Sequence, residues 1–211
     1  MTVLVSGGAD STFLWHALRE LGYDVSAVHV AHDLRGTESD EDVCFCRDTF
    51  GADVVEAPGS TEAELRELRY SRTRGLRATG HTASDQVESV LLGLVASGSP
   101  QRIKAKREDG VVRPLLGVWR EETRAWCDER GIAYRDDSSN AGTKRGLIRE
   151  RILPLLEALD PRARTSLLAL AGERPRLPRT LERTLADLLA SRDGSKAADL
   201  GDGVRAVREY D

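Results

Sequence analysis

Short apolar runs alternate with amphipathic stretches through the first half of the chain. Four of these runs have the length and composition of buried strands, namely Thr2–Val5, Val25–Val30, Asp53–Glu56 and Leu76–Thr79. The stretches between and after them predict helices at residues 10–21, 37–50, 62–74 and 84–97. Because strands that alternate with helices imply βαβ units, we predict an α/β domain with a doubly wound, parallel, Rossmann-like sheet.

Between the first predicted strand and the first predicted helix lies the segment Ser6-Gly7-Gly8-Ala9-Asp10-Ser11. Its glycines let the backbone approach a phosphate closely, and the free N–H groups at the start of the helix would face that anion. The lysine of the GxxxxGK[ST] loop is absent, so Mg²⁺ is the natural supplement and Asp10 its candidate ligand. Asp10 could also serve as a plain helix N-cap. The segment predicts that the chain binds ATP and cleaves it to AMP and pyrophosphate.

Beyond Gly98 the pattern changes. Residues 102–107 are basic, Val111–Pro114 predict a short strand, and Arg120–Arg130 predict a helix that ends at Gly131. A further helix is marked by apolar residues at helical spacing, namely Ile148, Ile152, Leu155 and Leu159. We therefore predict an ATP-binding, catalytic domain at 1–140 and a mostly helical, basic extension at 141–211.

The net charge of −4 argues weakly against a nucleic-acid partner, but the distribution of charge does not. Residues 1–60 hold three arginines and eleven acidic residues, whereas residues 143–185 hold ten lysines or arginines and five acidic residues. This asymmetry is compatible with a basic face on an acidic protein. Arginine also suits bidentate contacts with phosphate.

Membrane and metal-cluster classes find no support in the sequence. No apolar stretch approaches the roughly 18 residues of a membrane span, and Met1–Val5 run directly into the glycine loop without a signal peptide. We therefore expect a cytoplasmic protein without a membrane partner. The three cysteines, Cys44, Cys46 and Cys127, include no CxxC pair, so we expect reduced, mostly buried thiols.

The glycine loop is the hallmark of the PP-loop ATP pyrophosphatase superfamily, and further segments resemble the tRNA(Ile)-lysidine synthetase family. They follow in the family's order within residues 3–160 and comprise Ala31–Ser39, Gly80–Ser89, Arg113–Leu116, Arg120–Glu122 and Asp136–Asn140. Ala31 stands where the family usually has Asn. Arg145 and Arg149 match the family's Arg-Asn-Arg-Ile-Arg segment, whereas Gly146 and Leu147 depart from it.

The resemblance implies a ligase that forms a carbon–nitrogen bond. ATP would adenylate the C2 carbonyl of the wobble cytidine in the CAU anticodon of tRNA(Ile), and the ε-amine of L-lysine would then displace AMP. Implied catalytic residues are Asp10, His32, Arg35 and Asp85, and implied nucleotide contacts are Ser6, Gly7, Gly8, Ala9, Asp10, Ser11 and His81. Contacts with RNA are expected at Arg113, Lys144, Arg145 and Arg149. Related enzymes can be homodimers.

Two other functions stay open at this point. A tRNA thiolase of the same superfamily would need a sulfur donor and reactive cysteines, for which Cys44 and Cys46 are the nearest candidates. A non-catalytic nucleotide-binding module would bind ATP without releasing AMP. Because the chain ends at Asp211, where most relatives continue into tRNA-binding domains, a minimal form, a fragment and a decayed copy are all compatible with the sequence.

Overall fold

The computed structural model describes residues 1–31, 37–56, 73, 75–135, 143–172, 179–190, 194–201 and 204–208. The chain divides into two compact units, Met1–Ala171 and Gly172–Asp211. This division differs from the domain boundary predicted at residue 140, because the helices between residues 144 and 171 pack on the first unit rather than forming part of an extension.

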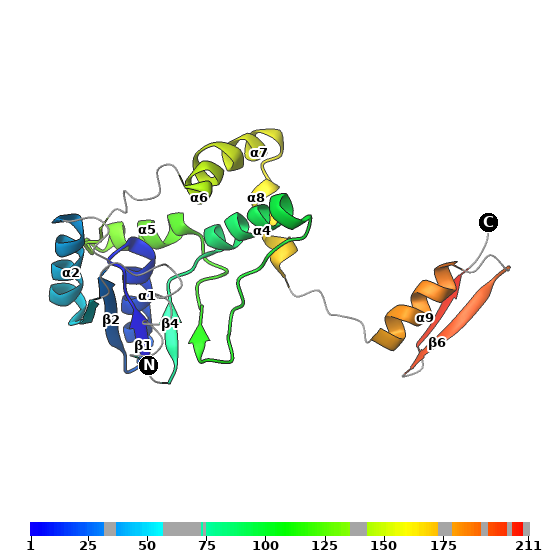
Figure 1. The fold of residues 1–211 in the computed structure, drawn as a ribbon, viewed down its shortest axis with the longest axis horizontal. Helices are drawn as coiled ribbons and strands as arrows, with labels where there is room; N and C mark the ends of the chain where they lie inside the picture. The colour runs from blue at the N-terminus through cyan, green and yellow to red at the C-terminus, as the bar shows by residue number, and fades with distance from the viewer. Residues whose placement is uncertain are drawn as a thin grey trace. The chain divides into compact units, whose positions relative to one another are not determined.

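The centre of the first unit is a five-stranded parallel sheet in the order β3-β2-β1-β4-β5 (Figure 1). Its strands are β1 (Thr2–Leu4), β2 (Ser26–Ala31), β3 (Asp53–Glu56), β4 (Arg77–Thr79) and β5 (Val111–Val112). Val3 of β1 pairs with Ala27 on one side and with Ala78 on the other. The chain order reverses between β1 and β4, and ligands of open α/β sheets bind at the carboxyl edge of such a switch point. The predicted doubly wound parallel sheet is confirmed.

Four helices of the first unit follow the predicted pattern, namely α1 (Ala9–Glu20), α2 (Thr37–Phe50), α4 (Ala83–Ser97) and α5 (Arg120–Glu129). The helix predicted at 62–74 lies outside the described residues apart from Thr73. Helix α1 packs beside α5, and α2 packs on β2. The N-cap of α1 is Gly8, in an extended conformation, so Asp10 is the second residue of the helix and not its cap.

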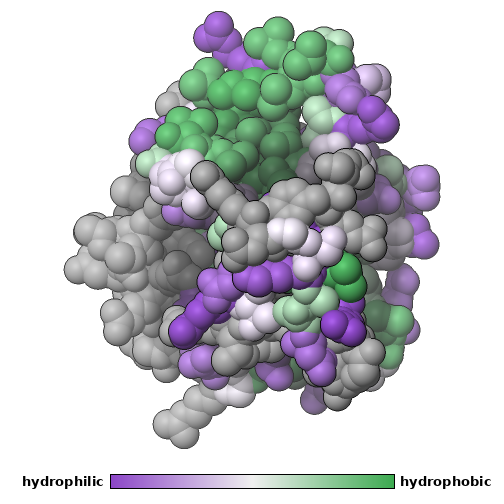
Figure 2. Space-filling model, turned by 90° about the vertical axis from the view of Figure 1, so that its right-hand side faces the viewer, coloured by the Kyte–Doolittle hydropathy of each residue, from purple (hydrophilic) through white to green (hydrophobic). Residues whose placement is uncertain are grey.

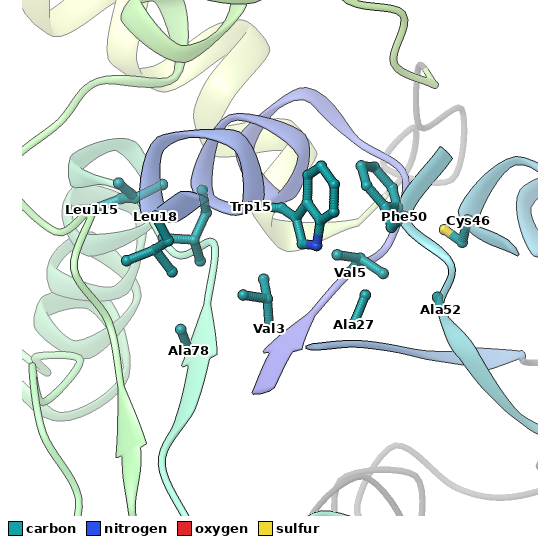
Figure 3. Close-up of a cluster of buried hydrophobic side chains, with 11 residues drawn as sticks. Val3, Val5, Trp15, Leu18, Ala27, Cys46, Phe50, Ala52, Ala78 and Leu115 are labelled. Carbon is teal, nitrogen blue, oxygen red and sulfur yellow. The ribbon is translucent and has the colours of Figure 1, made fainter. Parts of the chain in front are cut away.

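An apolar cluster joins the sheet to α1 and α2 (Figure 3). Trp15 of α1 contacts Phe50 of α2 edge to face, with ring centroids 5.3 Å apart. The buried members of the cluster are Val3, Val5, Leu14, Trp15, Leu18, Ala27, Cys46, Phe50, Ala52, Ala78 and Leu115. Full burial of a large apolar side chain contributes about 1.5–3 kcal/mol, so this cluster fixes the position of α1 and of the loop that precedes it.

A second apolar cluster joins α4 to the later helices. These are α6 (Lys144–Leu147), a π-helical turn (Ile148–Ile152), α7 (Leu153–Leu159) and α8 (Ala163–Ala171). Ile148 and Leu153 pack with Val87 of α4. The single helix predicted through residues 148–159 therefore contains a π turn, a feature that is rare and often found at functional sites.

The second unit contains helix α9 (Arg179–Ala190) and an antiparallel pair of strands, β6 (Lys196–Gly201) and β7 (Val204–Arg208). Leu188 is buried within the unit. The sequence indicated a mostly helical extension with one late strand, whereas the structure forms two paired strands after α9.

No helix in the described part of the chain is long and apolar enough to cross a membrane. Figure 2 shows apolar side chains gathered in the upper part of its view, where α7 and the end of α4 lie. Val95, Leu155 and Leu159 are the most exposed large apolar residues of these helices, with exposed fractions of 86%, 72% and 84%. They belong to the helical layer on α4 and not to the polar network described next.

Candidate active site

The glycine loop is held in shape by its own hydroxyl groups. The Ser6 N–H donates to Ser11 Oγ at 3.1 Å, and Ser11 Oγ donates to the Gly8 carbonyl at 3.0 Å. Thr12 Oγ1 donates to the same carbonyl at 3.0 Å. These bonds fix the loop directly before α1, where the first N–H groups of a helix have no partner within the helix. The loop therefore has the geometry of an anion site at a helix N-terminus.

Gly7 is required by the way in which the loop meets its neighbours. Its φ of +87° lies in the left-handed region, and a Cβ added there would lie 3.3 Å from both Arg135 Cγ and Phe45 Cδ1. The Arg135 N–H donates to the Gly7 carbonyl at 2.9 Å. The Arg135 side chain pairs with Glu41 at 2.7 Å and with Asp42 at 2.9 Å, both on α2. The loop is thereby tied to α2.

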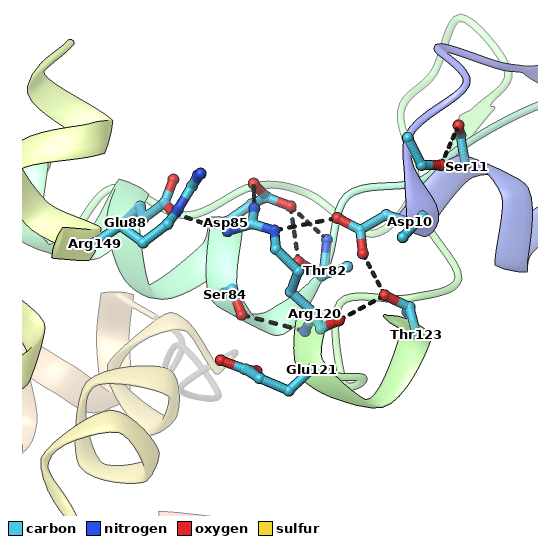
Figure 4. A network of polar contacts seen from close by, with 12 residues as sticks. Asp10, Ser11, Thr82, Ser84, Asp85, Glu88, Arg120, Glu121, Thr123 and Arg149 are labelled. Carbon is cyan, nitrogen blue, oxygen red and sulfur yellow. Dashed lines mark hydrogen bonds and ion pairs between the residues drawn. The ribbon is translucent and has the colours of Figure 1, made fainter. Parts of the chain in front are cut away.

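Asp10 turns its carboxylate from α1 toward α5 (Figure 4). Thr123 Oγ1 donates to Asp10 Oδ1, and Arg120 Nε donates to Asp10 Oδ2 at 3.3 Å. Burial raises the pKa of Asp10 above its usual range, because the loss of hydration outweighs the hydrogen bond from Thr123 and the attraction of Arg120. The side chain is 20% exposed, so a ligand can reach it.

Asp85 uses its two oxygens for different partners. Asp85 Oδ2 accepts hydrogen bonds from the Thr82 N–H at 2.7 Å and from Thr82 Oγ1 at 2.9 Å, which caps α4. Asp85 Oδ1 accepts from Arg120 at 2.8 Å. Burial alone would raise the pKa of Asp85, but Arg120 and the Thr82 hydrogen bonds outweigh it and hold that pKa below its usual range. Asp85 therefore both caps a helix and remains ionised in the network.

Glu88 lies one turn further along α4, and its side chain is only 1% exposed. It pairs with Arg120 at 3.4 Å, with Arg145 at 3.2 Å and with Arg149 at 2.8 Å. Arg145 also donates to Ser89 Oγ at 3.2 Å. A buried carboxylate is tolerated where its charge is paired and hydrogen-bonded, and three guanidinium groups meet that requirement here. Glu88 thus connects the glycine-loop side of the site to α6 and the π turn.

The structure brings Asp10 and Asp85, both predicted as catalytic, to the same guanidinium group. His81 stands at the carboxyl end of β4, and its Nδ1 is 2.8 Å from Thr79 Oγ1. The other two residues predicted as catalytic, His32 and Arg35, lie outside the described residues.

The four basic residues predicted to contact RNA lie in different environments. Arg145 and Arg149 pair with Glu88 while 43% and 32% of their side chains stay exposed. Lys144 is exposed at the start of α6. Arg113 is only 7% exposed, and its NH1 donates to the Lys104 carbonyl at 2.6 Å. Its guanidinium supports a neighbouring backbone segment, so we do not carry Arg113 forward as an RNA contact.

Sequence reasoning did not assign roles to Arg120, Thr123 or Glu88. Arg120 and Glu88 both lie in segments that carry the family resemblance, and Glu88 is an acidic residue one turn after Asp85, next to the apolar residues Val87 and Val90. These signals mark both positions as unusual. They do not indicate that the two residues meet, because α4 and α5 are more than 30 residues apart at the contact.

The surroundings of Asp10 fit a magnesium ion in part. Its carboxylate lies beside the glycine loop, and each oxygen keeps a lone pair beyond the one that Arg120 or Thr123 uses. Among the described residues, no group of three or more His, Cys, Asp or Glu side chains is arranged to hold a metal. Mg²⁺ commonly binds one or two carboxylates together with substrate phosphates and water, so Asp10 would suffice as a protein ligand.

The chain is similar in sequence to curated tRNA(Ile)-lysidine synthases from several bacteria. The tRNA(Ile)-lysidine synthase of Porphyromonas gingivalis strain W83 is 41% identical over 197 residues, which cover 79% of this chain and 42% of that protein. Those of Solibacter usitatus and Thermus thermophilus are 35% and 36% identical, and the matches cover 92% and 87% of this chain and 50% and 41% of those proteins. The chain thus spans about half the length of these curated relatives or less.

A solved structure shows the same fold at low sequence identity. The U34-tRNA thiolase NcsA from Methanococcus maripaludis superposes with a TM-score of 0.57 at 15% identity, covering 82% of this chain and 73% of that chain. Residues 1–156 match the sequence model of a protein family that is described as the PP-loop domain. The glycine loop lies at the switch point of a parallel sheet, and the family model covers most of the chain. The chain therefore belongs to the PP-loop family.

Proposed function

We propose that this chain carries the catalytic activity of a tRNA(Ile)-lysidine synthase. The observation that carries the proposal is the polar network in which Arg120 joins Asp10, next to the glycine loop, to Asp85 and Glu88 on α4. Glu88 in turn holds Arg145 and Arg149, the arginines that match the family's basic segment. In this proposal the nucleotide site and the RNA site share one set of charges, which would suit transfer of an adenylyl group to RNA.

The proposed reaction has two steps. The C2 carbonyl oxygen of the wobble cytidine attacks the α-phosphorus of ATP, and pyrophosphate leaves. The ε-amine of free L-lysine then attacks C2, the bond from C2 to the adenylate oxygen breaks, and AMP leaves. The nitrogen loses a proton during this step. The product has a new carbon–nitrogen bond, so the activity is that of a ligase that consumes ATP.

In the proposed first step, charge would develop beside the glycine loop. Its N–H groups at the start of α1, with the hydroxyls of Ser6 and Ser11, would hold the departing pyrophosphate. A helix dipole contributes only about 0.3–1 kcal/mol for a favourably placed charge, which is small beside the charge of a triphosphate. Mg²⁺ bound through Asp10 would supply further neutralisation when present. Arg120, fixed between Asp10 and Asp85, adds a permanent positive charge beside the loop.

The partners of the reaction follow from the same proposal. Contacts with tRNA would come from Arg145, Arg149 and Lys144. Arg145 and Arg149 belong to the network and stay partly exposed, and Lys144 is an exposed residue that precedes Arg145 in sequence. L-lysine is proposed as the second substrate from the curated relatives' names. A tRNA-modifying role also implies action in the cytoplasm. A homodimer is compatible with the proposal, and sedimentation can test it.

The competing thiolase function fits the cysteines poorly. Burial raises the pKa of Cys46 to about 12 and that of Cys127 to about 11, so both remain protonated thiols at neutral pH. The thiolate is the reactive form, and a buried thiol of this kind is chemically inert. Cys44 is exposed on α2. The two buried cysteines therefore pack in the protein core rather than acting as nucleophiles.

The decisive test is AMP release by the purified chain. We expect release from ATP when CAU-anticodon tRNA(Ile) and L-lysine are both present, and none when either is omitted. AMP release that is indifferent to the tRNA would refute the specific function while leaving the PP-loop assignment intact. Sulfur-donor dependence without any response to lysine would instead favour a thiolase, and ATP binding without AMP release would favour a non-catalytic module.

Asp10→Ala is the first variant to test. We expect loss of AMP release, because the carboxylate that Thr123 and Arg120 orient beside the glycine loop would be gone. Asp187→Ala, an exposed acidic residue of α9, is a suitable control for the loss of one carboxylate. Near-normal activity of Asp10→Ala would exclude Asp10 from the site.

A further inference from the structure

The basic segment Arg102–Lys106 has a position in the fold that the proposed chemistry does not use. It follows α4, and its end at Lys106 pairs antiparallel with Val112 of β5, the edge strand of the sheet. The Arg113 N–H donates to the Ala105 carbonyl at 2.8 Å, and the Arg107 N–H donates to the Val111 carbonyl at 2.9 Å. The chain at residues 105–107 thereby covers part of the open edge of the sheet, where unpaired N–H and C=O groups would otherwise be exposed.

Buried side chains hold this segment from below. Gln86 of α4 accepts from the Ile103 N–H at 2.7 Å and donates to the Ile103 carbonyl at 3.2 Å, so one amide satisfies both backbone groups. The buried Arg113 side chain donates to the Lys104 carbonyl at 2.6 Å. These hydrogen bonds hold the backbone of the segment in place. The Cα atoms from which its exposed side chains extend therefore have fixed positions.

Glycine at position 93 permits the close approach of the segment to α4. A Cβ there would lie 2.4 Å from the Gln101 nitrogen and 2.6 Å from the Ser99 carbonyl oxygen, closer than atoms in contact allow. The chain that leads into the basic segment therefore rests directly on the backbone of α4.

The side chains that this support presents to solvent are basic. Arg102, Lys104 and Lys106 occupy alternate positions, and all three are exposed. Among the described residues, no ion pair involves Lys104 or Lys106. The chain has only four lysines, namely Lys104, Lys106, Lys144 and Lys196, so two of the four stand in this segment. The backbone bends at Ala105, and the three exposed side chains give a row of separate cationic groups within five residues.

The position of the row relates it to the candidate active site. Gln86 follows Asp85 in the first turn of α4, and Arg113 follows β5 at the carboxyl edge of the sheet. The row therefore begins beside the turn that contributes Asp85 to the network and continues along the edge of the sheet. A polyanion that enters the site from this side would pass over it.

We propose that Arg102–Lys106, here called the edge strip, is a contact surface for the phosphate backbone of RNA. The proposal rests on the proposed function, which requires a tRNA at the neighbouring network. Lysine suits this role because its ammonium group is a compact charge on a flexible stem and needs no fixed orientation. Contacts of this kind position an RNA without reading its sequence. Gln86 and Arg113 are positioning residues for the strip, which accounts for the burial of Arg113.

The test is the salt dependence of tRNA binding by the whole chain. Lys104→Gln/Lys106→Gln keeps most of the length of both side chains and removes two charges. We expect weaker binding of a CAU-anticodon tRNA(Ile) transcript and of an unrelated tRNA alike. The slope of log K against log salt should fall in magnitude by about 1.5, since each lost phosphate contact changes it by about 0.7–0.9.

Arg47→Gln/Arg124→Gln is the matched control, since both arginines are exposed, on α2 and α5, and the loss of charge is the same. We expect its salt slope to equal that of the wild type. Equal losses in the two double variants would refute the strip, because only total charge would then matter. Unchanged tRNA binding with weakened binding of polyglutamate would also refute it, and would assign the strip to an acidic protein.

Gln86→Ala tests the support without changing the charge. We expect reduced tRNA affinity with an unchanged far-ultraviolet circular dichroism spectrum, whereas wild-type affinity would refute the positioning role of Gln86. The strip and the proposed function fail separately. AMP release by the wild type with no effect of the lysine substitutions on binding would refute only the strip. tRNA binding that the Lys104→Gln/Lys106→Gln substitutions weaken, in a wild-type chain that releases no AMP, would refute only the proposed function.

Discussion

At the scale of the residue, the site depends on the shape of one guanidinium group. Arg120 directs Nε to Asp10, one terminal nitrogen to Asp85 and the other to Glu88, so each nitrogen serves a different carboxylate. Its backbone N–H is also 3.3 Å from Ser84 Oγ. A lysine ammonium carries the same charge but lacks this planar, three-way geometry. The position of both predicted catalytic carboxylates therefore depends on arginine and not on positive charge alone.

Arg120→Lys tests this dependence. We expect kcat for AMP release to fall by about 10- to 100-fold, because small displacements of catalytic groups are costly, while KM for ATP changes less. Arg124→Lys, on the exposed side of the same helix, should leave both parameters unchanged. Wild-type kcat in Arg120→Lys would show that charge alone suffices.

Asp85 links the site to the stability of the fold. Its pKa is lower in the folded protein than in the unfolded chain, because Arg120 and the Thr82 hydrogen bonds outweigh the effect of burial. The stabilisation from Asp85 is therefore present above the unfolded pKa of about 3.9 and is lost as the pH falls through the lower, folded value.

The corresponding measurement compares the wild type with Asp85→Asn. We expect the wild type to have the larger free energy of unfolding in urea at about pH 6, and the difference to shrink as the pH falls from about 5 to about 2.5. Asp10 acts in the opposite direction, and most of its contribution cancels in the comparison, because burial, the largest cause that raises its pKa, is common to both proteins. A difference that stays constant over this range would contradict the ionised state of Asp85.

At the scale of the element, α4 connects the polar network of the candidate site to the later helices and to the edge strip. Its first turn is capped through Thr82 and Asp85, its next turn carries Glu88, and its apolar side packs on Ile148 and Leu153. The helix also supports the edge strip through Gln86 and Gly93. Its sequence must therefore satisfy a cap, an ion network, an apolar contact and a close backbone approach at the same time.

Gly93→Ala tests the close approach. Alanine favours a helix by about 1 kcal/mol relative to glycine, yet the added Cβ would overlap the Gln101 nitrogen and the Ser99 oxygen, and overpacking costs about 1–3 kcal/mol. We expect a lower urea midpoint and weaker tRNA binding. Gly117→Ala is the control, since no heavy atom lies within 4 Å of a Cβ there. A stabilised Gly93→Ala variant would mean that the strip does not rest on α4.

At the scale of the whole molecule, both apolar clusters and the complete described network lie within Met1–Ala171. The residues after Ala171 form a unit with its own helix and strand pair. We infer that the first unit contains what is needed to fold and to bind ATP.

A chain truncated after Ala171 tests this inference. We expect cooperative urea unfolding and an ATP affinity equal to that of the 211-residue chain, because the core and the glycine loop are retained. Circular dichroism and equilibrium ATP binding measure the two properties. Loss of cooperative unfolding in the truncated chain would show that the second unit supports the first.

The sequence by itself determined the fold class and the nucleotide loop, because both depend on local patterns. Strand and helix periodicity extend over 4–15 residues, and Gly7 with the hydroxyls of Ser6 and Ser11 shapes the loop through contacts within six positions. The glycine loop itself pointed to Asp10, whereas Asp85 was implied by the family resemblance of the segment Gly80–Ser89.

Only the tertiary structure decided which residues meet in the candidate site and which environment each basic residue has. The contacts of Arg120 with Asp10, of Arg145 with Glu88 and of Arg113 with Lys104 join residues 110, 57 and 9 positions apart. No periodicity connects such positions, because these contacts form only after folding has brought the segments together. Burial then separates arginines that look alike in sequence: Arg145 and Arg149 keep part of their charge exposed, whereas Arg113 supports the backbone from within.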